Sequence, residues 1–335
     1  IYGRRVIMDE LFDKMLYRAL KAKATDIHLV LKERLKIRFR VFGSLKKYDE
    51  LDEEIGGKLM NYIKYRALIN TNYRLLPQTG DFSITIQEKE YYLRVSYLPS
   101  LEFESIVIRI LNNHEIQSID ELTYQEDIKA YLHWLTHQQS GLFLISGATG
   151  SGKSTTLYTV LKEILLHENK NAISIEDPIE IHLDECLQIE LNEKLGITYH
   201  DTLKQILRHD PDVIMIGEVR DELTAKIAIT CALTGHLVLT TIHASSALLS
   251  LKRLMNLGVH QIDICDVVIG AMSQRMKYDS QKEQVIVLSE LMKKGEIKDY
   301  FEKQKISYLT FDKAAKQLIK QGFDQNLFIG DMANE

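Results

Sequence analysis

The chain has 335 residues, of which 45% are hydrophobic and 27% charged, and its formal net charge is −5. This composition is typical of a soluble globular protein with room for two domains, and the acidic balance argues against a nucleic-acid-binding stripe. No apolar run approaches the length of a membrane span, and no signal peptide is visible. Cys186, Cys231 and Cys265 lie far apart and form no C-x-x-C, which excludes a zinc ribbon and a disulfide framework and indicates buried free thiols.

The first part of the chain predicts a small α+β domain over residues 1–111. Met8–Ala24 has the apolar period of an amphipathic helix, and Ile55–Leu68 is a second helix candidate. Five short runs have β character: "DIHLVL", "KIRFRVF", "DFSITI", "EYYLRVSYL" and "ESIVIRIL". Residue types alternate in Lys36–Arg40 and Tyr91–Tyr97, which indicates a sheet with one wetter face.

Residues 112–122 are polar and have no strong period, so they are predicted to be a linker. From residue 123 to 335 the pattern changes to alternating strands and helices. The expected strands are Phe143–Ser146, Ile173–Glu176, Val213–Gly217 and Leu237–Ile242, and the expected helices are Thr155–Leu166, Asp221–Leu233 and Ser246–Leu257. Such alternation predicts an α/β fold with a mostly parallel sheet and helices on both faces. From about residue 280 the tail is interpreted as a few amphipathic helices.

Ligands of such sheets bind beyond the carboxyl ends of the strands, and a phosphate-binding motif lies at the first of these ends. Gly147–Ser154 reads G-A-T-G-S-G-K-S, which fits the P-loop pattern G-x-x-x-x-G-K-[ST] between a strand and a helix. Backbone N–H groups of the loop would turn toward phosphate oxygens, Lys153 would reach the β- and γ-phosphates, and the Ser154 hydroxyl would hold Mg²⁺. The expected phosphate-binding residues are Gly147, Ala148, Thr149, Gly150, Ser151, Gly152, Lys153, Ser154 and Thr155. The alternative is a glycine-rich turn without a ligand.

Two acidic segments follow at later strand ends. In "DPDVIMIGEVRD" the strand ends near Glu218, whose carboxylate could bind Mg²⁺ together with Ser154. In "ISIEDPIEI" the strand delivers Glu176 and Asp177 just before Pro178, which suggests a water-positioning base or a metal contact. The alternatives are a surface glutamate in the first segment and an ordinary acidic turn in the second.

Histidines and arginines complete the candidate site. His236 and His243 bracket an apolar strand seven residues apart, so a straight strand would point them to opposite faces. Each is as well explained by a structural role, and two histidines alone make no metal site. Arg94 and Arg109 lie inside strands of the first domain, where a fixed guanidinium could stabilise developing phosphate charge. The alternative for both arginines is a salt bridge within the sheet.

Together these stretches resemble the traffic ATPases of type II secretion, type IV pilus and competence systems (GspE/PilB-like), over most of residues 20–275. "GATGSGKSTTLY" is similar to the family's Walker A motif, "IEDPIE" (175–180) to its Asp box, "RHDPDVIMIGEVRD" (208–221) to its Walker B motif and "LTGHLVLTTIHA" (233–244) to its His box. "ATDIHL", "LPQTGDF", "RVSYLP" and "VIRIL" are similar to stretches of its N-terminal domain.

The resemblance implies a hexameric ring of two-domain subunits, each with a RecA-like ATPase domain preceded by a smaller PAS-like α+β domain, and with ATP bound between the domains. It implies that Lys153 and Ser154 bind phosphate and Mg²⁺ and that Glu218 is the Walker B carboxylate. It further implies that Glu176 is the general base. Its remaining site residues are two histidines and two arginines: His236, His243, Arg94 and Arg109.

The sequence departs from many members of this family in one feature, which indicates a subgroup. Many assembly ATPases carry a four-cysteine zinc element after a "QR" stretch, whereas "SQRMKYDSQKEQ" has no cysteine, so no zinc is expected. This resembles the competence pseudopilus ATPases of Gram-positive bacteria, the ComGA-like group. Retraction ATPases also lack zinc, but their C-terminal "AIRNLI"-like stretch is not found here.

The sequence therefore predicts a cytoplasmic ATPase that powers assembly of a competence pseudopilus for DNA uptake. It would lie at the cytoplasmic face of the membrane through a polytopic inner-membrane platform protein, with no direct contact to nucleic acid. The alternatives are a pilus-retraction or type IV secretion ATPase and, from another class, a nucleotide-gated scaffold with little turnover. A nucleic-acid motor is disfavoured because the acidic chain lacks a basic, aromatic-rich groove signature.

Overall fold

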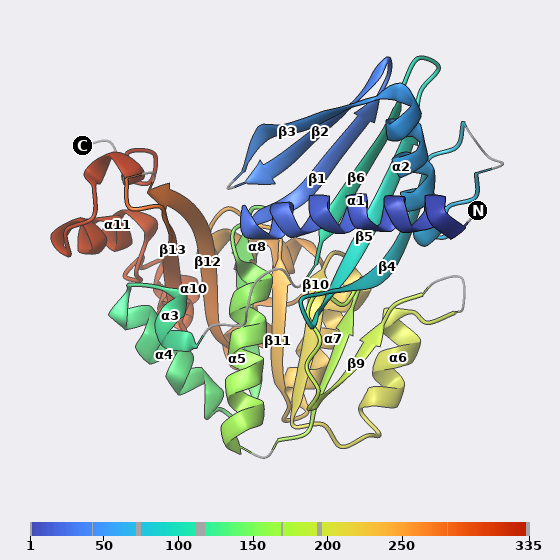
Figure 1. Cartoon of the computed structure of the whole chain (residues 1–335). Helices are drawn as coiled ribbons and strands as arrows, with labels where there is room; N and C mark the ends of the chain where they lie inside the picture. Colours follow the sequence, from blue (N-terminus) through green and yellow to red (C-terminus); the bar gives the residue numbers. More distant parts are fainter. Residues whose placement is uncertain are drawn as a thin grey trace. The chain divides into compact units, whose positions relative to one another are not determined.

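The chain forms two compact units, residues Ile1–Glu115 and Ile116–Glu335, each with its own sheet and core (Figure 1). The structure is a computed structural model that describes residues 2–41, 43–71, 75–111, 118–168, 170–192, 196–279 and 281–332. Among the helices of these residues, none combines the length and the apolar character that a bilayer crossing requires.

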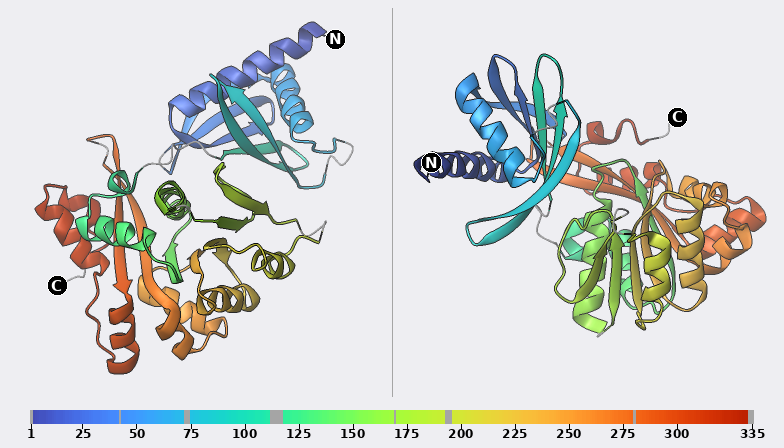
Figure 2. Two further views of the ribbon diagram at one scale, coloured as in Figure 1. Left: turned by 90° about the horizontal axis from the view of Figure 1, so that it is seen from below. Right: turned by 90° about the vertical axis from the view of Figure 1, so that its right-hand side faces the viewer.

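The first unit is an antiparallel six-stranded sheet with two helices on one face (Figure 2). The strand order is β3-β2-β1-β6-β5-β4. The strands are β1 (Ala24–Leu31), β2 (Arg34–Val41), β3 (Ser44–Asp52), β4 (Gln78–Ile86), β5 (Lys89–Pro99) and β6 (Glu104–Ile110), and the helices are α1 (Tyr2–Lys21) and α2 (Glu53–Arg66). Buried and more exposed residues alternate along β2 and β5, so the predicted sheet with one wetter face is confirmed.

The second unit is a seven-stranded sheet with strand order β13-β12-β7-β11-β10-β8-β9. Its neighbouring strands pair in parallel except for β12 and β13, which pair antiparallel. The strands are β7 (Gly141–Gly147), β8 (Ala172–Glu176), β9 (Cys186–Glu190), β10 (Val213–Val219), β11 (Leu237–Ile242), β12 (Val268–Asp279) and β13 (Gln284–Lys293). The helices are α3 (Ile119–Leu122), α4 (Glu126–Thr136), α5 (Lys153–Glu168), α6 (Tyr199–Ile206), α7 (Glu222–Leu233), α8 (Ala247–Asn256), α9 (Gln261–Val267), α10 (Lys294–Lys303) and α11 (Phe311–Lys320), with a 3₁₀ turn η2 (Gln325–Phe328).

The sheet of the second unit is buried on both faces, which explains why its central strands read as continuous apolar runs. Leu142 and Leu144 of β7 enter one core cluster, whereas the alternate residues Phe143 and Ile145 enter another. All four are fully buried. The predicted mostly parallel α/β sheet is therefore confirmed, and the carboxyl ends of its parallel strands lie at one edge.

Two predictions, one about the C-terminal tail and one about the linker between the units, were wrong. Gln284–Lys293, interpreted as part of a helical tail, is strand β13, because its apolar run pairs along its length with β12. The predicted linker 112–122 also ends too late, because Ile119 and Leu122 belong to helix α3 and are buried in the second unit. Residues 112–117 of that linker lie outside the described residues.

Candidate nucleotide-binding and hydrolysis site

The predicted P-loop connects the end of β7 to the start of α5. Gly147, Gly150 and Gly152 have φ angles of 144°, 78° and 88°, a backbone conformation that L side chains rarely adopt. A Cβ atom on Gly147 would lie 2.4 Å from the carbonyl oxygen of Gln274 and 2.5 Å from Ser151 Oγ. The glycines of the motif are thus required by the path of the backbone, which wraps around the start of α5 as a phosphate cradle does.

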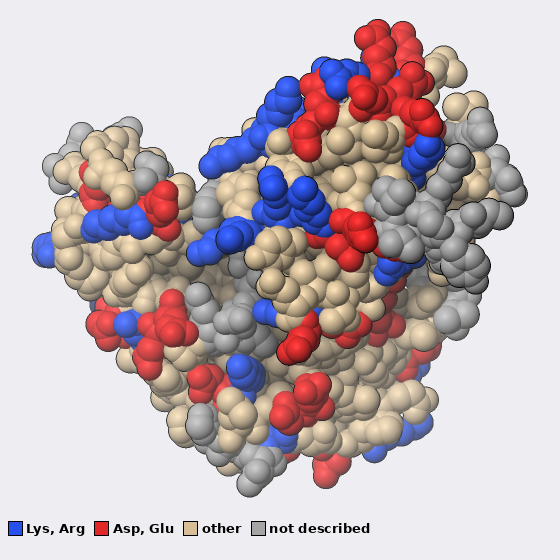
Figure 3. Space-filling view, viewed as in Figure 1, with Lys and Arg blue, Asp and Glu red and all other residues tan. Residues whose placement is uncertain are grey.

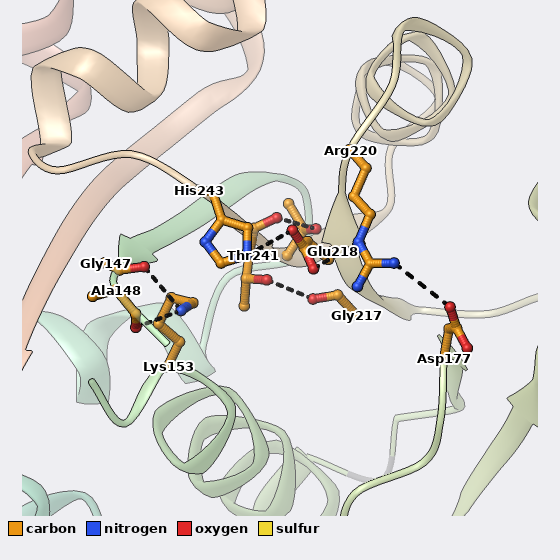
Figure 4. A network of polar contacts seen from close by, with 10 residues as sticks. Gly147, Ala148, Lys153, Asp177, Gly217, Glu218, Arg220, Thr241 and His243 are labelled. Carbon is orange, nitrogen blue, oxygen red and sulfur yellow. Dashed lines mark hydrogen bonds and ion pairs between the residues drawn. The ribbon is translucent and has the colours of Figure 1, made fainter. Parts of the chain in front are cut away.

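Lys153 is folded back onto this loop. Its Nζ donates hydrogen bonds of 3.0 Å to the carbonyl oxygens of both Gly147 and Ala148 (Figure 4). Burial lowers the pKa of Lys153, while the nearby carboxylates of Glu218 and Glu180 act in the opposite direction. A cation held by two carbonyl oxygens can exchange these neutral acceptors for phosphate oxygens, which bind an ammonium group more strongly.

A second cluster lies at the ends of β10 and β11. Glu218 Oε1 lies 3.0 Å from His243 Nε2, and its Oε2 accepts a hydrogen bond of 2.9 Å from Arg220 Nε. Arg220 also lies 3.6 Å from Asp177, the residue that follows β8. Figure 4 shows that these contacts join the segments that follow β8, β10 and β11 into one polar network. Because β8, β10, β11 and β7 are neighbours in the sheet, their carboxyl ends bring the network and the P-loop to one edge.

Glu176, the predicted base, lies in a closed pocket of donors. Its side chain is 3% exposed and accepts hydrogen bonds from Ser174 Oγ (2.6 Å), Gln188 Nε2 (3.2 Å) and the Tyr158 hydroxyl. Burial raises the pKa of Glu176, and the three hydrogen bonds oppose that rise. The same Tyr158 hydroxyl accepts 3.2 Å hydrogen bonds from the backbone N–H groups of Glu180 and Ile181. Glu176 therefore faces Tyr158 and supports the turn after β8 from beneath.

Sequence reasoning missed two residues of this edge. Glu180 is exposed, and its charge acts on Lys153. Arg220 bridges Glu218 and Asp177. Both lie inside motifs that the sequence analysis had singled out, "IEDPIE" and "GEVRD". The signal that could have identified them is that Glu180 is a second glutamate in its motif and that Arg220 lies beside carboxylates at a strand end.

The two histidines of the His box lie at opposite ends of β11. His243 follows the carboxyl end and contacts Glu218. His236 precedes the amino end, where its Nδ1 lies 3.0 Å from the Cys231 carbonyl oxygen and 3.1 Å from Thr234 Oγ1, at the last turn of α7. Within this unit the structure brings His243 to the candidate site and leaves His236 at the far end of the strand.

Arg94 and Arg109 belong to the first unit, where they lie directly opposite each other on β5 and β6. Arg109 Nε donates a 2.9 Å hydrogen bond to Asp26 Oδ1, and the Asp26 side chain is only 6% exposed. The predicted alternative of a salt bridge within the sheet thus describes Arg109. Like charges directly opposite on neighbouring strands are unfavourable, and the Asp26 carboxylate offsets the charge of Arg109. The expected action of both arginines on the phosphates stays a prediction.

The residues at the edge of the second unit fit a nucleoside triphosphate and Mg²⁺. The loop supplies backbone N–H groups and Lys153 for phosphate oxygens, and its positive-φ glycines leave the backbone open to close approach. The Ser154 hydroxyl and the Glu218 carboxylate are oxygen ligands of the kind that Mg²⁺ prefers. Glu218 is held on both oxygens by His243 and Arg220, so one of these contacts would give way to a metal ion.

Comparisons with known proteins agree with this geometry. The family described as type II/IV secretion system protein matches residues 3–322 of the chain. The competence protein ComGA of Bacillus subtilis (strain 168) is 38% identical over 80% of this chain and 76% of its own length. The type II secretion system protein E of Dickeya dadantii (strain 3937) is 38% identical over 79% of this chain, which spans only 54% of that relative.

Solved structures of similar fold cover nearly the whole chain. The pilus retraction motor PilT with bound ADP has a TM-score of 0.76 and 25% identity, covering 96% of this chain and 97% of its own. The Legionella pneumophila ATPase DotB has a TM-score of 0.79 at 23% identity, covering 95% of this chain and 94% of its own, and it bears on the fold alone. The predicted RecA-like fold class is confirmed by these likenesses.

Proposed function

The chain belongs to the type II/IV secretion system protein family, and on that premise we propose that it is a Mg²⁺-dependent ATPase that drives a pilus-like machine. We further propose that its work is assembly of a competence pseudopilus for DNA uptake. The support for this finer statement is the similarity to ComGA, 76% of whose length the chain covers.

The proposal rests on the cluster of charged side chains at the carboxyl ends of adjacent parallel strands. Lys153 follows β7, His243 follows β11, Glu218 lies near the end of β10, and Asp177 follows β8. This is the edge at which ligands of such sheets bind. A cation, a histidine and two carboxylates converging beside a phosphate loop match the requirements of phosphoryl transfer, which are positioning and neutralisation of charge.

Binding begins, in this proposal, with the exchange of Lys153 contacts. The ammonium group leaves the carbonyl oxygens of Gly147 and Ala148 and pairs with the β- and γ-phosphates of ATP. Backbone N–H groups of the loop and the N-terminus of α5 hold the remaining phosphate oxygens. When bound, Mg²⁺ would be held by Ser154 and Glu218 and would neutralise charge on the β- and γ-phosphates.

We propose Glu180, in place of Glu176, as the base that orients and deprotonates the attacking water. Glu180 is exposed on the turn after β8 and its charge reaches Lys153, whereas Glu176 is buried under three hydrogen-bond donors. A base must reach the proton it abstracts, and a carboxylate enclosed in this way cannot do so without breaking its hydrogen bonds. Glu176 becomes a positioning residue that acts through Tyr158 on the backbone of Glu180.

The assembly and its partners are also proposals. The chain would form a homo-hexamer at the cytoplasmic face of the membrane and act on a polytopic membrane platform protein. On the face drawn in Figure 3, the Lys and Arg side chains of the described residues are interspersed with Asp and Glu, which gives no support for a nucleic-acid groove there.

A pilus-retraction motor is the rival within the same enzyme class, and the 25% identity to PilT over nearly the whole chain keeps it in view. Pilus extension in cells lacking the gene separates the two functions, because a retraction motor is dispensable for extension. A scaffold with little turnover is the rival from another class, and a phosphate-release assay with purified protein decides it.

The proposed function is tested by measuring ATP hydrolysis against protein concentration, with the molecular mass measured in parallel. The proposal expects the activity per chain to rise as the mass moves from one chain to six. No hydrolysis at any concentration would contradict the enzyme. A monomer as active as the ring would contradict the part of the proposal that concerns the hexamer.

A further inference from the structure

Strand β12 forms the back wall of the P-loop. In the parallel pairing of β7 with β12, Gln274 lies opposite Gly147, and its carbonyl oxygen would touch any side chain placed on that glycine. The Gln274 side chain, 3% exposed, donates a 2.9 Å hydrogen bond from Nε2 to Thr156 Oγ1 in the first turn of α5. Both ends of the phosphate loop are thus held by one residue of β12.

The next residue on β12, Arg275, links this wall to three other segments. Its guanidinium lies 3.9 Å from the centroid of the Phe311 ring at the start of α11. Its Nη1 donates to Asp331 Oδ1 in the C-terminal tail. Its Nη2 donates at 3.5 Å to the carbonyl oxygen of Ser245, two residues after His243. A shift of Arg275 would therefore move both the P-loop wall and the loop that carries His243.

Asp331 forms an ion pair with Arg275 from a buried position. Its side chain is 2% exposed and forms ion pairs with both Arg275 and Lys277, which project from alternate positions of β12. Buried Phe328 fixes the tail by packing in a small apolar cluster with residues of β13 and α11, among them Leu288 and Leu318. The backbone N–H of Asp331 donates a 2.8 Å hydrogen bond to the Phe328 carbonyl oxygen.

Removing this carboxylate would leave two cations of β12 without their buried partner. The Arg275 and Lys277 side chains are 38% and 25% exposed, so solvent would screen part of their charge, but two like charges at alternate positions of one strand would repel each other without the carboxylate between them. The strand would relieve this by shifting or twisting toward solvent. Gln274, between the P-loop and Arg275, would move with it.

We propose that Asp331 is a positioning residue for nucleotide binding, which acts through Arg275 and Lys277 to hold β12 against the P-loop. The inference rests on the proposed function, because it takes ATP as the ligand of that loop. Coupling between two sites is reciprocal. ATP in the loop therefore favours the docked tail as much as the docked tail favours ATP.

The test compares Asp331→Asn with Asp324→Asn in the full chain. Asp324 lies exposed in the same tail and caps η2, a position that Asn fills equally well, so it is a matched control. The affinity for a fluorescent ATP analogue is measured by titration, and hydrogen exchange of residues 321–332 is measured with and without ATP. The proposal expects Asp331→Asn to bind the analogue at least fivefold more weakly. It also expects ATP to slow tail exchange in the wild type and in Asp324→Asn, but not in Asp331→Asn.

An affinity of folded Asp331→Asn within twofold of the wild type would overturn the inference, as would tail exchange in the wild type that ATP leaves unchanged. If Asp331→Asn does not fold, Arg275→Lys replaces it, since lysine keeps the charge but loses the planar fork and the ring contact. A fivefold loss of affinity in that variant supports the inference, and an unchanged affinity overturns it. A wild-type chain that binds no ATP would overturn the proposed function itself.

Discussion

Tyr158→Phe tests whether the buried contacts of the Tyr158 hydroxyl position the turn that carries the proposed base Glu180. The substitution removes one hydroxyl group and leaves the ring in place. That hydroxyl donates to the buried carboxylate of Glu176 and accepts the backbone N–H groups of Glu180 and Ile181. One atom therefore serves three partners in the turn that carries the proposed base.

The expected loss follows from these contacts. A hydrogen bond to a charged group contributes about 1.5–3 kcal/mol, and two N–H groups that lose their acceptor add up to about 1 kcal/mol. The free energy of unfolding should fall by about 2–4 kcal/mol, which lowers Tm by about 4–16 °C. The turn should also lose its fixed position, and kcat should fall about tenfold or more, because small misplacements of reacting groups are costly.

The control is Tyr131→Phe, in the same unit and equally conservative. The Tyr131 hydroxyl is buried and donates a single 2.9 Å hydrogen bond to the Ile269 carbonyl oxygen, away from the turn after β8. Its loss should cost about 1 kcal/mol and leave kcat within about twofold. Thermal unfolding and steady-state phosphate release measure both effects. Equal losses of Tm in the two variants, with kcat unchanged in Tyr158→Phe, would refute the positioning role of Tyr158 and Glu176.

Three further outcomes are expected. Lys153→Ala should abolish ATP binding in a nucleotide titration, and binding of wild-type strength would exclude the loop as the phosphate site. Arg220→Gln should lower the Mg²⁺ concentration for half-maximal phosphate release by about two- to fivefold, since an ion pair worth up to about 1 kcal/mol no longer competes for Glu218; a higher Mg²⁺ demand would contradict this. Burial raises the pKa of the Glu290 carboxyl above its ordinary value of 4.5, so the folded state favours the protonated form. The stability that protonated Glu290 contributes is therefore lost as the pH rises from 4.5 through the raised pKa of the folded state. The wild type should therefore gain stability relative to Glu290→Gln as pH falls from 7 toward 5 in urea unfolding, and parallel pH profiles would contradict the shift.

Local signals in the sequence were sufficient for the strands and loops that hold the nucleotide. The P-loop was predictable because its glycines, its lysine and the following helix are contiguous in the chain, and β7, β8, β10 and β11 because their buried runs are uninterrupted. β12 and β13 were missed because their stability comes from pairing with each other and with β7, across more than a hundred residues in the last case. A periodicity within one segment carries no information on such partners.

The orientation of single side chains could not be predicted from spacing. Glu176 and Glu180 belong to one motif, and nothing in its letters shows which carboxylate turns inward. The decision depends on Tyr158, eighteen residues earlier on α5, and on Gln188 of β9, which together supply donors to Glu176. The spacing of His236 and His243 predicted opposite faces of the strand but not which histidine reaches the site, and the contact with Glu218 distinguishes His243 from His236.

The central claim, that Glu180 and not Glu176 is the base, is tested most directly with the variants Glu180→Gln and Glu176→Gln. For each variant the affinity for ATP and the rate of single-turnover phosphate release are measured. The account predicts that Glu180→Gln binds ATP with wild-type affinity and releases phosphate at least a hundredfold more slowly. Glu176→Gln should slow by only about tenfold per folded molecule, because its amide oxygen still accepts from Ser174 and Gln188 while its amide nitrogen cannot accept from the Tyr158 hydroxyl. A fast Glu180→Gln beside an inactive, well-folded Glu176→Gln would contradict the account.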